Sequence, residues 1–341
     1  MAEPRPFSVL ILGCGNIAGG FDAVRPVDAW PLTHAGAFHR HPGFRIAACL
    51  DPDDDRRRAF MARWAVQKGF AALAELADSS AAACDVIAIC SPTACHAEHL
   101  RFAIAQRPRL IFCEKPITPD AALSRALVSA CAEAGIPLMV NHTRRWAPDL
   151  CALGEDLRAG RYGAVRSLHG VYNKGVLNNG SHLVDLIQFL LAEPLHLIAA
   201  APPVWDYAAD DPSVPALLAS QSGVPVSMQV AHAQDYALFE LQIVTARGVI
   251  SMEDGGASLR LRPVIDSPTF AGYRCLDRGE PRPGAYAEAM TQAIANLYGA
   301  LTVGQPLAST GSTALAAQEL CAAIKSAALS ADGKKTHDRC C

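Results

Sequence analysis

The sequence lacks an excess of charge of either sign. Its 341 residues hold 30 Lys and Arg against 33 Asp and Glu, a formal net charge of −3. This balance gives no broad electrostatic attraction to nucleic acid or to an anionic membrane surface, so we expect neither as a partner. Hydrophobic residues make up 51% of the chain and charged residues 18%, which is typical of a folded globular protein.

Long apolar runs are also missing. The most apolar later stretch covers residues 183–201, and Asp185, Glu193 and Pro194 interrupt it, so it does not predict a membrane span. No N-terminal segment has the charged-then-apolar form of a signal peptide. We therefore expect a cytoplasmic protein.

Metal and disulfide patterns are absent although the chain has 12 cysteines. There is no CxxC pair and no Cys/His group with zinc-site spacing, so we expect no metal. Several cysteines lie in or beside apolar strand patterns, where a free thiol behaves as a small hydrophobe. They are Cys49, Cys84, Cys90 and Cys113. This distribution favours a reducing compartment.

What the sequence does contain begins with a glycine fingerprint. Residues 9–18 read Val-Leu-Ile-Leu-Gly-Cys-Gly-Asn-Ile-Ala, an apolar strand pattern followed by Gly-x-Gly-x-x-Ala. The first glycine lets the chain turn off the strand, the second lets the backbone approach a pyrophosphate, and the alanine lets the next helix pack closely. This pattern predicts a dinucleotide site. The expected contacts are Gly13, Gly15, Asn16, Ile17 and Ala18.

A second strand is expected over Phe44–Leu50, with Asp51 at its carboxyl end. An acid there binds the adenosine ribose hydroxyls and repels a 2′-phosphate, which favours NAD over NADP. The gap from the fingerprint is roughly double the usual distance of about 20 residues. The surplus lies at 19–31, which has two prolines and a glycine pair. It is either a solvated loop or a flap over cofactor or substrate.

Strand and helix patterns alternate through the first 140 residues, which predicts an α/β fold with a doubly wound parallel sheet. Further strands are expected at 85–90, 110–113 and 138–140, and helices at 56–67, 70–76, 96–106 and 120–134. After a helix near 148–159, short alternating segments predict a mainly antiparallel sheet with one face covered. They lie at 165–172, 226–231, 239–245, 249–253 and 258–262, and are followed by helices near 285–298 and 313–329.

These patterns predict three parts of the chain. We expect a dinucleotide-binding domain at 1–141, an α+β domain at 142–330 and a polar tail at 331–341 that ends in Cys340 and Cys341. The site is expected in the cleft between the two domains.

Three groups of residues carry candidate chemistry. Lys115 follows Glu114 at the carboxyl end of a strand, where it could exchange a proton with a substrate hydroxyl; a surface ion pair between the two is the alternative. The segment 178–185 is expected to open a helix. His182 in this segment could shuttle a proton, with Asn178 one turn before it; alternatively Asp185 holds it as a structural histidine. The segment 141–148 could hold the nicotinamide or an anionic substrate, or be a linker with ordinary ion pairs.

Together these motifs resemble the glucose–fructose oxidoreductase/inositol dehydrogenase/rhizopine-catabolism (Gfo/Idh/MocA) family over nearly the whole chain, most specifically at Glu114-Lys115-Pro116. The resemblance implies an N-terminal Rossmann domain, an antiparallel-sheet domain often used for oligomerisation, and bound NAD or NADP. It makes Lys115 and His182 the catalytic residues. It also implies a homo-oligomer, a dimer or tetramer, formed through the C-terminal sheet. The further cofactor contacts that we expect are Ser91, Pro92, His96, Glu114, Lys115 and Asn141.

One position departs from the family pattern. Many members have an aspartate four residues before the histidine, where this chain has Asn178. An amide can orient a hydroxyl but cannot take its proton, so proton transfer should fall on Lys115 or His182. A diphosphate on the substrate would give Lys174, or an arginine of the insertion at 19–31, a partner. The expected substrate contacts are Asn178, Lys174, Arg145 and Asp185.

The function implied is an NAD-dependent oxidoreductase. It would move a hydride between the nicotinamide and a carbinol or keto carbon of a sugar or sugar derivative. A nucleotide-linked substrate in carbohydrate or polysaccharide biosynthesis is the finer possibility. The alternatives are an NAD-dependent glycosidase of the same fold and a regulator that binds the dinucleotide without turnover.

Overall fold

The computed structural model describes residues 5–26 and 28–337, and the chain divides into two compact units. The first unit contains the residues up to Trp146 together with Ala287–Leu315. The second contains Ala147–Tyr286 and the residues from Ala316 onwards. The expected domain limits at 141 and 330 stay predictions. Residues 338–341 of the expected tail, with Cys340 and Cys341, lie outside the described residues.

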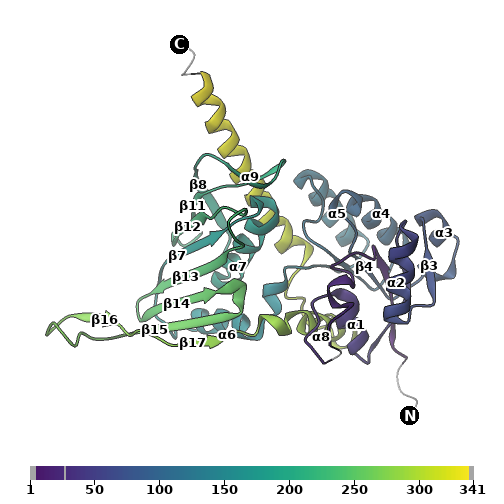
Figure 1. Ribbon diagram of the computed structural model, residues 1–341, viewed down its shortest axis with the longest axis horizontal. Helices are drawn as coiled ribbons and strands as arrows, with labels where there is room; N and C mark the ends of the chain where they lie inside the picture. Colours follow the sequence, from purple (N-terminus) through teal and green to yellow (C-terminus); the bar gives the residue numbers. More distant parts are fainter. Residues whose placement is uncertain (1–4, 27, 338–341) are drawn as a thin grey trace. The chain divides into compact units, whose positions relative to one another are not determined.

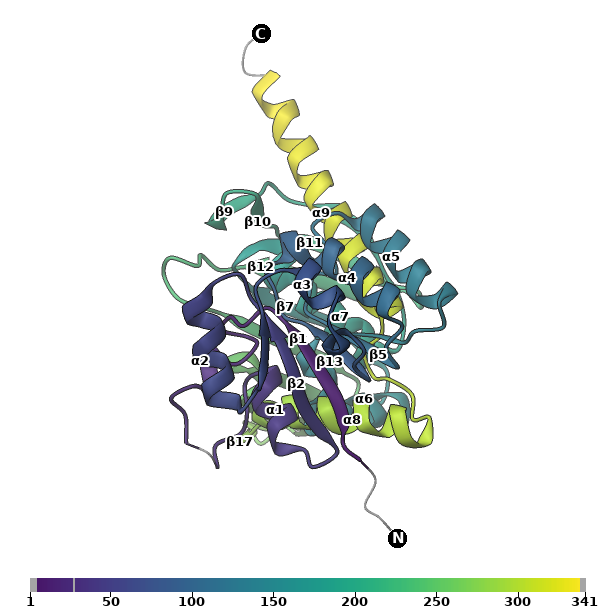
Figure 2. The ribbon, with the colours of Figure 1, turned by 90° about the vertical axis from the view of Figure 1, so that its right-hand side faces the viewer.

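The first unit is built on a six-stranded parallel sheet with the strand order β3-β2-β1-β4-β5-β6 (Figure 1, Figure 2). The apolar runs form its strands because a parallel sheet is buried on both faces. The strands are β1 (Phe7–Leu12), β2 (Phe44–Leu50), β3 (Lys68–Phe70), β4 (Val86–Ile89), β5 (Leu110–Cys113) and β6 (Leu138–Val140). The predicted doubly wound parallel sheet is confirmed.

Helices connect these strands, and several begin at an acidic cap. Asp53 accepts a hydrogen bond from the Arg56 amide at 2.9 Å, and Asp120 accepts one from the Leu123 amide at 2.7 Å, which satisfies amides that a helix start leaves unpaired. The helices are α1 (His34–Arg40), α2 (Asp54–Trp64), α3 (Leu73–Ala77), α4 (His96–Gln106), α5 (Ala121–Glu133) and α8 (Ala289–Val303).

One expected helix start was wrong. The segment 70–76 was expected to be helical from its first residue, but Phe70 ends β3 and pairs with Leu50. The helix begins only at Leu73. A three-residue edge strand is too short for its alternation to register in the sequence.

The second unit contains a nine-stranded sheet in which every neighbouring pair is antiparallel except β7 and β12. This confirms a mainly antiparallel sheet. Its strands are β7 (Val165–Tyr172), β8 (Leu195–Ala200), β11 (Ala216–Ser220), β12 (Pro225–Val230), β13 (Phe239–Thr245), β14 (Gly248–Glu253), β15 (Ser258–Asp266), β16 (Arg274–Leu276) and β17 (Pro281–Pro283). The sequence patterns had not indicated β8, β11, β16 or β17.

The second unit also has α6 (Pro148–Arg158), α7 (Ser181–Leu191) and part of α9 (Gly311–His337). A Cβ atom at Gly170 of β7 would lie 2.5 Å from Leu183 of α7, so this glycine lets α7 pack directly on the sheet. A separate hairpin of β9 (Val204–Ala208) and β10 (Asp211–Ser213) completes the unit. That hairpin was not expected either, and it bears on the site described below.

The described residues show no membrane-spanning helix, no metal cluster and no disulfide. None of their helices has the length and apolarity to cross a bilayer. Nor do these residues contain a group of three or more His, Cys, Asp or Glu side chains arranged to hold a metal ion. All cysteines in this part of the chain are free thiols, and those at positions 49, 84, 90 and 113 are buried, as their apolar surroundings in the sequence predict.

Candidate functional site

The glycine turn after β1 has the geometry that its sequence predicts. Gly13 adopts a φ of 94°, and a Cβ atom there would lie 2.6 Å from the backbone of Ser91, so only glycine fits. At Gly15 a Cβ atom would meet no atom within 4 Å, which leaves the backbone open to a ligand. Ala18 is fully buried. The turn therefore combines close packing at its first glycine with an open face at its second.

Asp51 is tied to this turn. One carboxylate oxygen accepts a hydrogen bond from the Cys14 amide at 2.8 Å, and the other accepts one from the Asp53 amide at 3.0 Å. Arg56 also lies 3.5 Å from the second oxygen. Asp51 is only 3% exposed. The acid that the sequence assigns to ribose recognition thus also fixes the position of the glycine turn.

The segment between the fingerprint and α1 is anchored at both ends. The amides of His34 and Ala35 donate to the carbonyls of Ile17 and Ala18 at 3.2 and 2.8 Å, so α1 continues the turn of the fingerprint. We call residues 19–33, which follow Ala18 and end directly before His34, the inserted segment.

A buried carboxylate closes the inserted segment. Asp22 accepts hydrogen bonds from the Thr33 hydroxyl at 2.6 Å and from the Thr33 amide at 2.9 Å. Thr33 in turn caps α1 by accepting from the Gly36 amide at 3.1 Å. Between these anchors Val24 is almost fully exposed, and Phe21 and Trp30 are about half exposed. The choice between a solvated loop and a flap stays open.

Glu114 is the centre of a buried polar cluster at the carboxyl edge of the sheet. Its Oε1 atom accepts from His34 Nε2 at 2.8 Å and from Asn141 Nδ2 at 2.6 Å. Burial raises the pKa of Glu114. Three neighbours lower it, and together they outweigh burial: His34 by its hydrogen bond and charge, Asn141 by its hydrogen bond and Lys115 by its charge. The net pKa lies below the ordinary value, so the carboxylate is ionised at neutral pH.

This cluster bears on the ion-pair alternative for Glu114 and Lys115. Glu114 is 8% exposed and bonded to His34 and Asn141, so it is no surface carboxylate. Lys115 is partly buried, and its amide donates to Glu114 Oε2 at 3.3 Å. The Lys115–Pro116 peptide bond is cis. Lys115 thus follows a rigidly held carboxylate at the strand edge where ligands bind in such sheets.

His96 joins two of the expected cofactor segments. Its ring nitrogens lie 2.9 Å from the carbonyl oxygens of Ser91 and Pro116. His99 adds a contact of 2.9 Å to the Ser91 hydroxyl, and burial lowers the pKa of this histidine. His96 is 1% exposed, whereas Pro92 beside it is exposed. His96 therefore sets the relative position of the segments that follow β4 and β5.

Arg145 lies in the 3-10 turn Thr143–Trp146 and is buried. Its guanidinium donates to the Ala308 carbonyl at 3.1 Å. The first unit consists of two stretches of chain, one that ends at Trp146 and one that covers 287–315. Arg145 connects these two stretches. Its role in substrate binding stays a prediction.

In the second unit, Asn178 lies in a short π-helix, Gly175–Gly180, and α7 begins only at Ser181. The expectation that the Asn178 segment opens the helix is corrected in this respect. Asn178 Nδ2 donates to the Lys174 carbonyl at 3.0 Å. His182 is partly buried in the first turn of α7, and Asp185 is buried one turn later.

Two aspartates that the sequence analysis missed hold this π-helix. Asp211 accepts from the Leu177 and Asn178 amides at 2.9 and 2.8 Å, and Asp206 accepts from the Lys174 amide at 3.1 Å. A Cβ atom at Gly175 would lie 2.1 Å from Asp211 Oδ2. Burial raises the pKa of Asp211, although these amide bonds act against that shift.

The missed aspartates had no clear signal in the sequence. They stand in the polar run Asp206-Tyr-Ala-Ala-Asp-Asp-Pro-Ser213, which is typical of an exposed loop. In the structure both are buried, because they accept the backbone amides that the π-helix leaves unpaired. His34 was missed for a similar reason, since it follows the inserted segment and has no motif of its own.

Residues 7–142 match the model of an oxidoreductase family, GFO_IDH_MocA, described as having an NAD-binding Rossmann fold. This confirms the resemblance inferred from the motifs. The chain is 29% identical over 263 residues to D-apiose dehydrogenase of Paraburkholderia graminis, covering 72% of this chain and 66% of that enzyme. It is also 29% identical over 272 residues to inositol 2-dehydrogenase of Rhizobium meliloti, covering 73% and 80%.

Solved structures share the fold across both units. The WlbA dehydrogenase of Bordetella pertussis, crystallised with NADH and UDP-GlcNAcA, superposes with a TM-score of 0.74 at 17% identity, covering 95% of this chain and 97% of that one. Other structures of the same fold were solved with NAD+ or with NADP. At these identities the likeness concerns the fold.

Proposed function

We propose that this protein, whose residues 7–142 match the model of the GFO_IDH_MocA oxidoreductase family, is an NAD-dependent dehydrogenase that acts on a hydroxyl group of a sugar or cyclic polyol. The observation that carries the proposal is the Glu114 cluster. A buried carboxylate, bonded to His34 and Asn141, holds Lys115 at the same sheet edge as the glycine turn. The proposed cofactor turn and the lysine proposed for proton transfer therefore follow strands of one sheet at the same edge.

The residues of the first unit suit a dinucleotide. Gly15 leaves open space where a pyrophosphate would approach, and Asp51 offers a carboxylate at the end of β2. We propose Gly13, Gly15, Asn16, Ile17 and Ala18 as the phosphate-binding turn. When bound, the nicotinamide supplies the hydride acceptor for a carbinol carbon.

We propose NAD over NADP as the cofactor. The carboxylate of Asp51 would repel a 2′-phosphate, and its bond to Cys14 keeps it directed at the turn. Titration calorimetry with both cofactors tests this, and tighter binding of NAD+ is expected. Equal or tighter binding of NADP+ would contradict the role given to Asp51.

The proton chemistry would fall on Lys115 and His182. Lys115 would accept the proton of the substrate hydroxyl, and His182 would assist, because both side chains can exchange a proton when their pKa is tuned towards neutrality. Asn178 would orient a hydroxyl without taking its proton. Its side chain is already directed by the Lys174 carbonyl, which supports an orienting role.

For the substrate we propose a sugar or cyclic polyol, with a nucleotide-linked sugar as the finer hypothesis. The two curated relatives are named for D-apiose and inositol, whereas WlbA was crystallised with a nucleotide sugar. Lys174 lies partly buried with its ammonium 6.0 Å from the Tyr207 ring centre. It could pair with a diphosphate, and Arg145 and Asp185 are the further proposed contacts.

A substrate panel separates these possibilities. The purified protein is incubated with NAD+ and with free sugars, cyclic polyols, UDP-sugars or aryl glycosides, and both NADH and released aglycone are measured. Accumulating NADH supports the dehydrogenase and identifies its substrate class. Release of an aglycone without net NADH would instead indicate a glycosidase. Cofactor binding without any turnover would indicate a regulator.

We propose that the protein forms a homo-oligomer, a dimer or tetramer, through the sheet of the second unit. Leu217 on β11 and Ile198 on β8 are large apolar side chains about half exposed on neighbouring strands, a liability that an interface would cover. Light scattering of the wild type and of Leu217→Asp tests this. A monomeric wild type would contradict it.

We also propose a cytoplasmic location. The free buried thiols support it, because free thiols persist in a reducing compartment.

A further inference from the structure

His34 is a buried histidine that takes no part in the proton transfer proposed above. Its Nε2 atom lies 2.8 Å from Glu114 Oε1. The Glu114 carboxylate is ionised and can only accept a hydrogen bond, so Nε2 is the donor. Nδ1 of His34 is also buried and has no hydrogen-bond partner among the described residues. Glu114 is therefore the one polar partner of this ring in the part of the chain that the structure describes.

Phe112 holds the ring of His34 from the side. The two ring centres are 4.5 Å apart, which places the rings in contact. Phe112 is fully buried in β5, two residues before Glu114. One strand thus sets the position of both the ring contact and the carboxylate. Moving His34 away from Glu114 would also cost the contact with Phe112.

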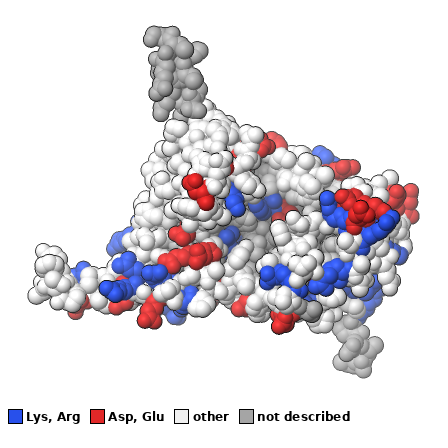
Figure 3. Space-filling model, viewed as in Figure 1, with Lys and Arg blue, Asp and Glu red and all other residues white. Residues whose placement is uncertain are grey.

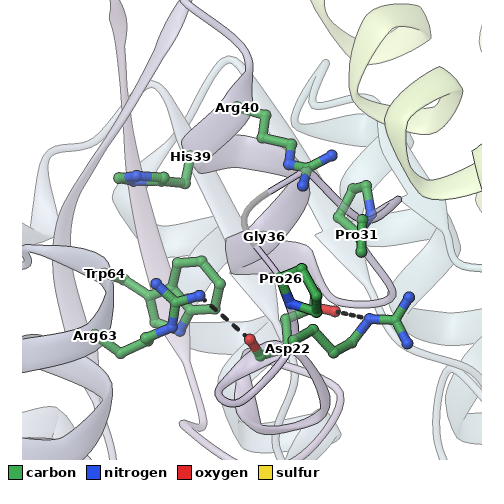
Figure 4. A pocket seen from close by; sticks show the side chains of 10 residues that line it. Asp22, Pro26, Pro31, Gly36, His39, Arg40, Arg63 and Trp64 are labelled. Carbon is green, nitrogen blue, oxygen red and sulfur yellow. Dashed lines mark hydrogen bonds and ion pairs between the residues drawn. The ribbon is translucent and has the colours of Figure 1, made fainter.

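The backbone at His34 is held by the base of the inserted segment. Asp22 is buried and accepts hydrogen bonds from the amide and the hydroxyl of Thr33. A Cβ atom at Gly36 would clash with this carboxylate, so the glycine lets Asp22 reach the first turn of α1 (Figure 4). His34 therefore stands at a helix start whose cap and glycine are both fitted to the inserted segment.

The contact between His34 and Glu114 differs from the ion pairs on the surface. Side chains of both charges gather on the surface where α2 lies (Figure 3), and the paired side chains of Arg58 and Asp54 there are 72% and 48% exposed. Water screens such a pair, so it contributes little. The side chains of His34 and Glu114 are 0% and 11% exposed. Their contact therefore acts in a medium of low polarity, where a hydrogen bond is electrostatically stronger.

The two oxygen atoms of Glu114 have different partners. Oε1 accepts from His34 and, at 2.6 Å, from Asn141 Nδ2. Oε2 accepts from the Lys115 amide at 3.3 Å. Because both oxygens belong to one planar group, the donors that fix Oε1 also fix the direction in which Oε2 points. His34 is thus connected to the backbone of Lys115 through one rigid carboxylate.

We propose that His34 is a positioning residue for Lys115 and that it acts through Glu114. This inference rests on the proposed function, because the proton transfer assigned to Lys115 is what gives the position of this lysine a consequence. The ring of His34 is fully buried, so it acts on the reaction only through the carboxylate. Loss of its hydrogen bond should displace the lysine and leave the glycine turn, where the cofactor is expected to bind, unchanged.

NMR spectroscopy of the lysine side chains tests this without any turnover. The chain has six lysines, so ¹³C labelling at Cε gives a simple spectrum, and the signal missing from Lys115→Met is that of Lys115. His34→Leu removes the donor, whereas His34→Gln places an amide N–H near the position of Nε2. We expect the Lys115 signal to move in His34→Leu and to return towards its wild-type position in His34→Gln. Both variants lack the imidazole, so loss of the ring cannot explain a difference between them.

His39→Leu is the matched control. His39 lies on the same helix and is exposed, with its ring 5.8 Å from that of Trp64 (Figure 4), so this variant should leave the Lys115 signal unchanged. If His34→Leu does not fold, as judged by circular dichroism, His34→Asn replaces it, because its shorter side chain does not reach Glu114. The proposal is overturned if the Lys115 signal is the same with and without the donor. It is also overturned if His34→Gln moves the signal as far as His34→Leu.

Kinetics with the substrate that gives NADH in the panel described above extend the test. His34→Leu should lower kcat on the order of tenfold, because a small misplacement of a reacting group is costly, and the affinity for NAD+ should be unchanged. His34→Gln should restore most of the loss. An unchanged kcat in His34→Leu would overturn the positioning role. If the wild type forms no NADH with any substrate, the dehydrogenase proposal fails, while the lysine signal still decides the role of His34.

Discussion

The imidazole of His34 lies 2.8 Å from the carboxylate of Glu114, although 80 residues separate them in the sequence. His34 is the first residue of α1, directly after the inserted segment. Glu114 precedes the lysine to which we assign proton transfer. The inserted segment is therefore attached, through one buried hydrogen bond, to the strand end that carries Lys115. The return point of the segment is thereby fixed at the proposed catalytic edge.

The pKa of Glu114 predicts a pH dependence of stability. Burial raises this pKa, but the combined lowering by His34, Asn141 and Lys115 is larger. The folded-state pKa therefore lies below that of the unfolded chain. The ionised group therefore stabilises the fold above the unfolded value of about 4.3, and this contribution is lost as the pH falls through the folded pKa. Glu114→Gln should remove it.

Urea unfolding across this acid range measures the effect. The midpoint for the wild type should fall more steeply than that for Glu114→Gln. Glu133→Gln, at an exposed position at the end of α5, is the matched control and should follow the wild type. Parallel curves for all three proteins would mean that folding does not lower the pKa of Glu114.

Lys115→Met should abolish most turnover while leaving NAD+ affinity nearly unchanged. A proton-transfer group typically contributes about 10²–10⁴-fold to the rate, and the methionine keeps most of the side-chain volume. Steady-state kinetics and calorimetry measure the two effects separately.

His182→Ala should also slow turnover. If His182→Ala mainly lowers the melting temperature, the structural-histidine alternative is correct; near wild-type kinetics for Lys115→Met would remove the lysine from the mechanism.

Asn178→Asp should move the pH–rate profile to higher pH. The new carboxylate would stand one turn before His182 and would raise the proton affinity of nearby basic groups. The maximum rate need not increase. Asn178→Ala serves as the comparison and should weaken turnover or substrate binding without affecting cofactor affinity. Coincident profiles for the wild type and Asn178→Asp would place this residue outside the site.

Asp211→Asn should lower kcat/KM on the order of tenfold or more, because a small misplacement of a catalytic segment is costly. The carboxylate accepts two amides of the π-helix, and a carboxamide would turn a donor towards one of them. NAD+ affinity should be unchanged, because the glycine turn belongs to the other unit. The neighbouring exposed Asp210→Asn is the control. Equal loss in both variants would contradict a positioning role for Asp211.

The sequence was most informative where local pattern and local structure coincide. The glycine at position 13 could be assigned because its positive φ and its approach to Ser91 are requirements that the motif encodes. The strands β2 and β5 were predicted with their observed limits, because continuous apolar runs mark buried parallel strands.

The remainder depended on contacts between distant residues. The bonds from Asp206 and Asp211 to the π-helix span more than 30 residues, and a polar run in sequence does not reveal that its aspartates are buried. The same holds for His34, whose bond to Glu114 joins residues that are 80 positions apart in the sequence. Short strands such as β10 and β17 also carry too few residues for alternation to register.

The way α1 continues the fingerprint turn has a consequence for the engineering of this chain. Each of the two bonds that join His34 and Ala35 to Ile17 and Ala18 spans 17 residues, where an uninterrupted α-helix spans four. Thirteen residues are therefore looped out with the helical phase preserved. The inserted segment 19–33 has fifteen residues, so excising thirteen of them should leave two residues that join Ala18 to His34 with both bonds in helical spacing. We expect the same base to accept an inserted sequence of another kind.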